Sequence, residues 1–225
     1  MQIRPQQGPA QPADSVALLP GHQGEITDKR LLRGARTRQI VLRQAVDIAS
    51  LDGLEAVSFG RLATATGISK AGVQTLFRTK EALQLTAVGY ARELFTEAVV
   101  APARLVAHGV ARLRALIENW IVYVERPLFA GGCFWVANLA DYDSRPGPIR
   151  DALKHQQQEW TTLLAAELRH AVTAKEIREL DVELAAFQID AVLRATNTAL
   201  RMGDDDAVVR AHRIVDGILV PLPRE

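Results

Sequence analysis

Apolar side chains recur at helical spacing over most of this chain. The first stripe begins at Thr37, includes Val41, Ala45 and Ile48, and is followed by a stop signal at Gly53. Apolar positions that are three and four residues apart lie on one face of an α-helix. The pattern therefore predicts a first helix of about four turns that ends just before the glycine.

Two short helices are predicted after this first helix. Ser58 is placed to cap the first of them, and Gly67 breaks it. Ser69 is placed to cap the second, in which Val73 and Phe77 are expected to turn inward. Two short helices joined by a turn that contains glycine are the parts of a helix-turn-helix.

The remaining residues also follow helical periodicity, and no segment shows the alternation of a strand. A fourth helix is expected to begin at Thr79, run to about Val100 and end before Pro102. The pattern predicts an all-α fold of about nine helices. The later helices are expected over about 106–124, 133–140, 149–172, 181–201 and 205–219.

Residues 1–30 differ from the rest of the chain, because four prolines occur there among glutamines and glycines without a sustained period. This composition predicts a flexible tail. No stretch approaches the roughly 18 apolar residues of a membrane span, no apolar signal region follows the first basic residue, and the single cysteine, Cys133, excludes an internal disulfide. We expect a cytoplasmic protein with no metal and no cofactor.

Charge is distributed unevenly along the chain. The formal net charge is +1. Residues 1–80 carry 11 Lys and Arg against 6 Asp and Glu, a net charge of +5, whereas residues 81–225 have a net charge of −4. A basic surface for a polyanionic partner is therefore expected in the part that holds the helix-turn-helix.

Two segments around this motif resemble a known family. Residues 37–49 read TRQIVLRQAVDIA and residues 67–83 read GISKAGVQTLFRTKEAL. They are similar to the first helix, and to the turn, recognition helix and fourth-helix start, of the TetR family of transcriptional regulators. The resemblance covers about residues 36–88. It implies a DNA-binding domain over 31–82 and a ligand-binding and dimerisation domain over 83–225.

The resemblance also implies two kinds of DNA contact. The second short helix faces the base edges, and polar groups at helix starts touch phosphates, where free N–H groups favour an anion. A basic arm before the motif, which includes Arg30 and Arg33, is expected to follow the DNA backbone or enter a minor groove. The predicted base-facing residues are Ser69, Lys70, Ala71, Gln74 and Thr75, the phosphate contacts are Ser58 and Lys80, and the arm contacts are Arg36 and Arg38.

Three positions depart from the family pattern. Gln74 stands where a tyrosine is common, Leu76 where a histidine or tyrosine is common, and Gly60 where an arginine often occurs. Contacts that those usual residues make are therefore missing or replaced in this chain. Gln74 carries an amide that can pair with an adenine edge.

The C-terminal domain is expected to serve two purposes. Its last two helices would form a homodimer that sets two recognition helices over a palindromic operator, and a pocket between the other helices would hold a small-molecule effector. The predicted dimer residues are Leu184, Phe187, Ala191, Val208, Val215, Ile218 and Leu219. The predicted pocket residues are Trp120, Tyr123, Phe129, Cys133, Phe134, Asn138 and Trp160, with Trp135 in the same aromatic cluster.

Other functions receive less support from the sequence. The chain has no nucleophile elbow, no zinc-protease motif and no phosphate-binding glycine loop, so an enzyme is disfavoured. A helical adaptor protein that has lost DNA binding remains an alternative, because three positions depart from the family pattern. For Cys133, a buried inert thiol is favoured over a redox sensor. We therefore interpret the sequence as that of a ligand-responsive transcriptional regulator, and we favour a repressor over an activator.

Overall fold

The computed structural model of the protein describes residues 23–223. Backbone contacts divide the chain into two units, Met1–Thr37 and Arg38–Glu225, and each is taken by itself. Helix α1 spans Gln23–Asp52, so residues 23–37 of the first unit are helical. The flexible tail predicted over 1–30 is therefore wrong for residues 23–30, and its remainder, residues 1–22, lies outside the described residues.

The predicted helix-turn-helix is present in the second unit. A short 3₁₀ turn, η1 (Leu54–Ala56), follows α1, and the motif itself consists of α2 (Phe59–Thr66) and α3 (Lys70–Phe77). The hydroxyl of Ser58 accepts a hydrogen bond from the Arg61 N–H at 3.2 Å, and that of Ser69 accepts one from the Gly72 N–H at 3.1 Å. Gly67 ends α2 with φ of 70°, a conformation that suits glycine. The caps and the turn are those that the sequence predicted.

The fourth helix differs from the prediction near its end. Helix α4 (Lys80–Phe95) begins where it was expected, with Thr79 as its N-cap, but it continues into a π-helical turn, η2 (Thr96–Val100), and a short helix, α5 (Ala101–Ala103). The helical path includes Pro102 and ends one residue later, at Ala103. The π turn is helical backbone with one extra residue per turn.

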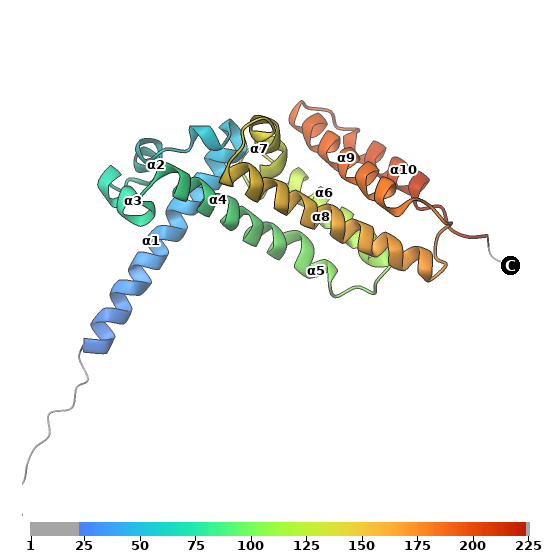
Figure 1. The fold of residues 1–225 in the computed structure, drawn as a ribbon, viewed down its shortest axis with the longest axis horizontal. Helices are drawn as coiled ribbons and strands as arrows, with labels where there is room; N and C mark the ends of the chain where they lie inside the picture. The colour runs from blue at the N-terminus through green and yellow to red at the C-terminus, as the bar shows by residue number, and fades with distance from the viewer. Residues whose placement is uncertain (1–22, 224–225) are drawn as a thin grey trace, which may run out of the picture. The chain divides into compact units, whose positions relative to one another are not determined.

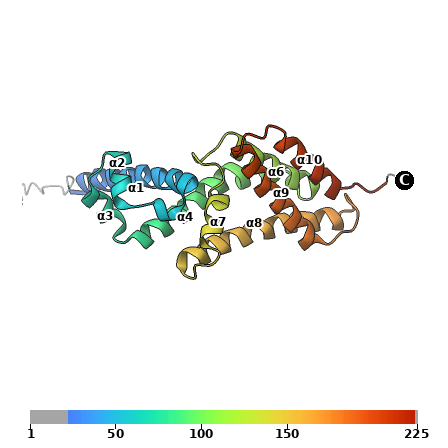
Figure 2. The ribbon, with the colours of Figure 1, turned by 90° about the horizontal axis from the view of Figure 1, so that it is seen from above.

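The other named elements of the described chain are also helices, which confirms the predicted all-α fold class. Figures 1 and 2 show α8 and α9 side by side, with α10 packed on α9. None of the described helices combines the length and the apolar character that a membrane span requires. The remaining helices are α6 (Val110–Glu125), α7 (Phe134–Tyr142), α8 (Pro148–Thr173), α9 (Val182–Arg201) and α10 (Ala207–Ile218).

The core lies where α4, α6, α8 and α9 meet. Leu113 and Ile117 on α6, Leu164 and Leu168 on α8 and Leu193 on α9 are all at most 1% exposed. Removing a leucine or isoleucine side chain from water stabilises a fold by about 1.5–3 kcal/mol. This rigid packing fixes the helices that surround the cavity described below.

Candidate DNA-binding surface and ligand cavity

Helix α3 has one buried face and one exposed face. Val73 and Phe77 are buried at 0% and 4% exposure and hold the helix against the rest of the motif. The opposite face is polar or small and open to solvent. Its exposed residues are Ser69, Lys70, Ala71, Gln74 and Thr75, the five that were predicted to face base edges.

The hydroxyl groups on this surface keep hydrogen-bonding capacity after their internal bonds are made. Ser58 and Ser69 each use an oxygen lone pair to cap a helix, so their O–H groups remain able to donate. Thr75 donates its O–H to the Ala71 carbonyl at 2.8 Å, and its oxygen can still accept a bond. These hydroxyls therefore suit phosphate or base contacts.

Lys80 is engaged within the chain. Its Nζ donates to the backbone carbonyl of Glu55 and to the Glu55 carboxylate, both at 2.9 Å. The same carboxylate accepts a hydrogen bond from the Tyr142 hydroxyl at 2.8 Å, and the bonds from Lys80 and Tyr142 lower the pKa of Glu55. A phosphate at the start of α4 would have to share Lys80 with Glu55.

Arg38 does not belong to a free arm. Its guanidinium donates to the Leu76 carbonyl at 2.8 Å and lies over the Phe77 ring, 4.5 Å from the ring centre. These contacts join α1 to the end of α3, so Arg38 positions the recognition helix, and a DNA phosphate would have to share its guanidinium with the Leu76 carbonyl. Arg36, the other predicted arm residue, is exposed.

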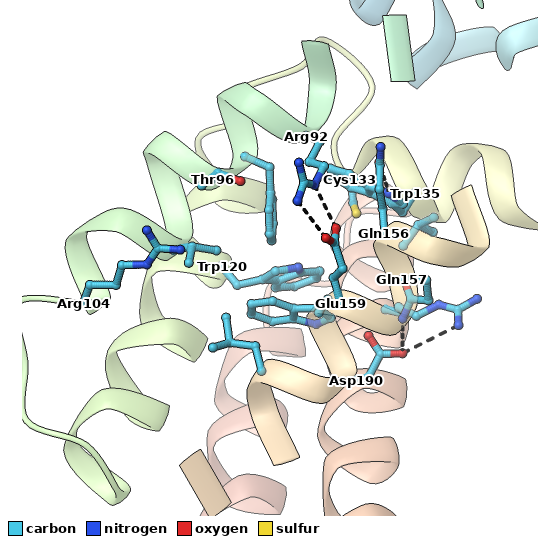
Figure 3. A pocket seen from close by; sticks show the side chains of 16 residues that line it. Arg92, Thr96, Arg104, Trp120, Cys133, Trp135, Gln156, Gln157, Glu159 and Asp190 are labelled. Atoms are coloured by element: carbon cyan, nitrogen blue, oxygen red, sulfur yellow. Dashed lines mark hydrogen bonds and ion pairs between the residues drawn. The ribbon is translucent and has the colours of Figure 1, made fainter. Parts of the chain in front are cut away.

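A cavity of about 330 Å³ lies among α4, the π turn, α6, α8 and α9 (Figure 3). This volume is within the range of small-molecule sites. Three of the predicted pocket residues line it, namely Trp120, Cys133 and Trp160. The other lining residues are Arg92, Phe95, Thr96, Val100, Arg104, Trp135, Val136, Gln156, Gln157, Glu159, Leu163, Asp190 and Arg194.

The two acidic side chains of the cavity lie in separate hydrogen-bonded sets (Figure 3). At one end, Arg92 donates two hydrogen bonds to the Glu159 carboxylate, at 2.8 and 2.7 Å. At the other end, Gln157 donates to the Asp190 carboxylate at 2.8 Å, and an Arg194 nitrogen lies 3.7 Å from the same oxygen. Burial raises the pKa of Asp190, although Gln157 and Arg194 oppose the shift.

Four predicted pocket residues do not line this cavity. Phe129 and Phe134 are fully buried in the neighbouring core, and the Tyr123 hydroxyl accepts a hydrogen bond from the Phe134 N–H at 3.1 Å. Asn138 is turned toward α1. These four positions are therefore corrected from ligand contacts to packing and positioning residues.

Asn138 joins α7 to the end of α1. Its Oδ1 accepts a hydrogen bond from the Leu54 N–H at 2.7 Å, and its Nδ2 donates to the Ala49 carbonyl at 3.1 Å. Two loop N–H groups just before α7 make similar contacts, since Ala130 donates to Asp47 at 3.1 Å and Gly131 donates to the Ser50 hydroxyl at 2.8 Å. We name the segment 128–138 the tether, because it connects the cavity wall to α1.

Cys133 lies in the tether and is buried. Its backbone N–H donates to the Asn197 side chain at 2.9 Å. Burial raises the pKa of its thiol, so the reactive thiolate is disfavoured. These observations agree with the inert thiol that the sequence favoured.

The predicted dimer residues fall into two groups. Leu184, Phe187 and Ala191 are exposed on α9, with Leu184 at 53% and Phe187 at 67%. Val215 and Leu219, in contrast, are each 2% exposed in the core of this chain, so their prediction as interface residues is corrected. The half-buried members are Val208 and Ile218, and exposed Val209 and Ile214 were not predicted.

Sequence reasoning missed the charged and amide groups of the cavity. Glu159 and Asp190 are far apart in the sequence, and only the packing of α8 on α9 places them around one space. One signal was available at Asp190, an acidic residue between the apolar positions Ile189 and Leu193 on the inner face of α9. An acidic residue on the apolar face of a helix indicates a buried polar site.

Comparisons with known proteins agree with this architecture. Residues 109–215 match the family model described as Tetracyclin repressor-like, C-terminal domain. A comparison of the sequence with curated proteins finds no match. A TetR transcriptional regulator from Chloroflexus aurantiacus superposes with a TM-score of 0.75 and 24% identity, covering 82% of this chain and 94% of that one.

Two further similar structures contain bound molecules. The structure of AibR in complex with isovaleryl coenzyme A and operator DNA has a TM-score of 0.65 and 21% identity, with 82% of this chain and 99% of that one covered. A putative transcriptional regulator from Saccharomonospora viridis in complex with choline has a TM-score of 0.69 and 18% identity, with 82% and 95% covered. The resemblance predicted from the helix-turn-helix is thus confirmed, because the chain has the fold of TetR-family transcriptional regulators and its residues 109–215 match the model of their C-terminal domain.

Proposed function

We propose that the protein is a cytoplasmic transcriptional repressor that binds a palindromic operator as a homodimer and is released by a small-molecule ligand. The observation that carries this proposal is the polar, exposed face of α3, held in place by its buried face and by Arg38. The AibR structure, which holds operator DNA and a coenzyme A thioester, supports it by likeness of fold.

The exposed face of α3 suits the major groove. Ala71 has a small side chain that permits close approach to the bases, and the Gln74 amide matches the donor and acceptor of an adenine. Lys70 adds a positive charge for a phosphate or a guanine edge. The O–H groups of Ser58 and Ser69 can donate to phosphates at the starts of two helices.

An exposed apolar strip on α9 and α10 supports the dimer. Leu184, Phe187, Val209 and Ile214 are between 48% and 67% exposed. Large apolar side chains exposed on two neighbouring helices are typical of a protein interface. Two copies that meet through this strip would form a four-helix arrangement, and the resulting two-fold symmetry would match a palindromic site.

The tether supplies a physical route from the cavity to DNA. Cys133, Trp135 and Val136 line the cavity, while Gly131 and Asn138 in the same segment bond to α1. A ligand that favours a different position of the tether would shift α1 and the recognition helix that Arg38 fixes to it. For the ligand to release the protein from DNA, it must bind the two conformations, with the tether on α1 and with the tether displaced, with different affinities.

Electrophoretic mobility shift tests the DNA-binding part of the proposal. The purified protein is titrated onto a labelled fragment flanking its gene at two salt concentrations, beside a Lys70→Ala, Thr75→Ala double variant. A Lys154→Ala, Thr162→Ala variant on the exposed surface of α8 is the matched control. We expect a shift that weakens with salt, a loss of at least about tenfold in affinity for the α3 variant, and no loss for the control.

The outcome discriminates between functions. Equal binding by the wild type and the α3 variant would place DNA recognition elsewhere and refute the role assigned to α3. Absence of any shift with specific or competitor DNA would favour a helical adaptor that binds proteins.

A further inference from the structure

The buried end of the cavity carries an acidic group with spare hydrogen-bonding capacity. Asp190 is only 6% exposed, yet it lines the cavity. Its Oδ2 accepts the hydrogen bond from Gln157, and Arg194 approaches that same oxygen no closer than 3.7 Å. Among the described residues, none donates a hydrogen bond to Oδ1. A carboxylate oxygen that lines a cavity without a donor favours a ligand that brings one.

Aromatic rings form part of the wall of the same cavity. Phe95, Trp120, Trp135 and Trp160 line the cavity, and each is at most 8% exposed. Phe95 packs edge-to-face against Trp135 and Trp160, with ring centres 5.0 and 5.4 Å apart. Aromatic faces in a desolvated site attract an organic cation through the ring quadrupole.

Trp160 provides a second unsatisfied group at the same place. Its indole Nε1 is buried and forms no hydrogen bond with any described residue. The indole lies near enough to Asp190 to lower the pKa of that carboxyl, although it does not complete a hydrogen bond. Trp160 thus faces Asp190 without saturating it, and the carboxylate keeps capacity for a further donor.

The positive charges of the cavity lie toward solvent. The Arg92 side chain is 51% exposed and is already bound by Glu159 through two hydrogen bonds. The Arg194 side chain is 45% exposed, whereas that of Asp190 is 8% exposed, and Arg104 is also exposed. The least exposed of these charges is thus the Asp190 carboxylate, with Arg194 as its partner at 3.7 Å, and an anionic group placed against the carboxylate would be repelled by it.

We propose that the cavity binds an organic ammonium ion, with the charged nitrogen beside Asp190 and the apolar body among the four aromatic rings. This inference rests on the proposed function for its regulatory meaning, because the ammonium compound would be the effector. A neutral apolar ligand would leave the Asp190 carboxylate buried without a new partner, so the site discriminates against it. Arg104, which is exposed on the cavity wall, would then contact a polar group at the far end of the ligand.

A matched series of probes tests the charge preference. 4-Phenylbutylamine, 4-phenylbutanol and 4-phenylbutyrate share one apolar body and differ in the charge of the end group. All three tryptophans of the chain line the cavity, so quenching of intrinsic fluorescence reports occupancy, and titration calorimetry supplies the dissociation constants. We expect the amine to bind at least tenfold more tightly than the alcohol or the carboxylate.

Two variants locate the preference. Asp190→Asn keeps the shape of the side chain and removes its charge, and it should weaken amine binding at least tenfold while alcohol binding stays within threefold. Asp205→Asn makes the same chemical change at an exposed position and should leave all three dissociation constants unchanged. Circular dichroism checks that both variants are folded.

These binding measurements test the inference about the ligand independently of whether the protein binds DNA. Tighter binding of the carboxylate, equal binding of the three probes, or an Asp190→Asn variant that keeps the amine preference would overturn it. If the protein binds no DNA but prefers the amine through Asp190, the proposed repressor function fails and the inference about the ligand stands. If the protein shifts operator DNA but prefers the carboxylate, only the ligand inference fails.

Discussion

The close approach of the tether to α1 depends on the absence of a side chain at Gly131. A Cβ added there would lie 1.9 Å from the carbonyl oxygen of Ser50, 2.2 Å from its carbon and 2.6 Å from the Leu51 nitrogen. These are backbone atoms, so no side-chain rotation relieves the clash. The backbones must separate, and the hydrogen bond from the Gly131 N–H to the Ser50 hydroxyl is lost with them.

The expected cost of Gly131→Ala follows from these two effects. Overpacking in a tight contact lowers the free energy of unfolding by about 1–3 kcal/mol, and loss of the hydrogen bond lowers it by about 1 kcal/mol more. We therefore expect the free energy of unfolding to fall by about 2–4 kcal/mol. Urea unfolding followed by circular dichroism measures this change, with all proteins at one concentration because association affects apparent stability.

Gly89→Ala is the matched control for this substitution. Gly89 lies within α4, and a Cβ there would meet no atom within 4 Å. Alanine in a helix interior is favoured over glycine by about 0.5–1 kcal/mol, so the control should gain stability. If Gly131→Ala unfolds at the same urea concentration as the wild type, the tight contact between the tether and α1 does not exist in solution.

Three further substitutions give predictions of different kinds. Asn138→Leu leaves the buried Leu54 N–H without an acceptor and should lower the free energy of unfolding by about 2–4 kcal/mol in urea; an unchanged midpoint would contradict the assigned hydrogen bonds. Because burial raises the pKa of Asp190 in the folded chain, the wild type should lose stability as pH rises through and above the ordinary range of an aspartate, and Asp190→Asn should not. Thermal unfolding of both proteins between about pH 4 and about pH 8 checks this, and parallel curves would refute it. Phe187→Asp puts a charge on the exposed strip and should convert the dimer to monomer in sedimentation velocity, whereas a dimer that persists would place the interface elsewhere.

The parts of the fold that follow from local chemistry were predictable from the sequence. The caps at Ser58, Ser69 and Thr79 and the left-handed turn at Gly67 each depend on one residue and its near neighbours. The π turn at 96–100 was not predictable, because one extra residue per turn leaves the local hydrophobic pattern compatible with an ordinary α-helix. The start of α1 at Gln23 was missed because the nearby prolines dominated the interpretation of the first 30 residues.

The same distinction applies to the candidate sites. The outward face of α3 follows from helical periodicity once Val73 and Phe77 are buried, so all five base-facing residues were predicted as exposed. The cavity depends on which helices meet, and an aromatic cluster in the sequence does not say which ring faces a space and which faces the core. Phe129 and Phe95 illustrate this, since the predicted residue is fully buried and the unpredicted one lines the cavity.

The contacts of the tether favour an abrupt switch over a graded one. Asn138 holds α1 through two hydrogen bonds, and the packing at Gly131 leaves no room for a side chain, so small sliding movements would break these contacts without replacing them. Closely packed interfaces of this kind tend to occupy discrete arrangements. A ligand that displaces Trp135 from its hydrogen bond to Gln156 would act on the segment that also carries Gly131 and Asn138. The recognition helix should therefore change position in one step, when the tether leaves α1, and remain in place at lower occupancy of the cavity.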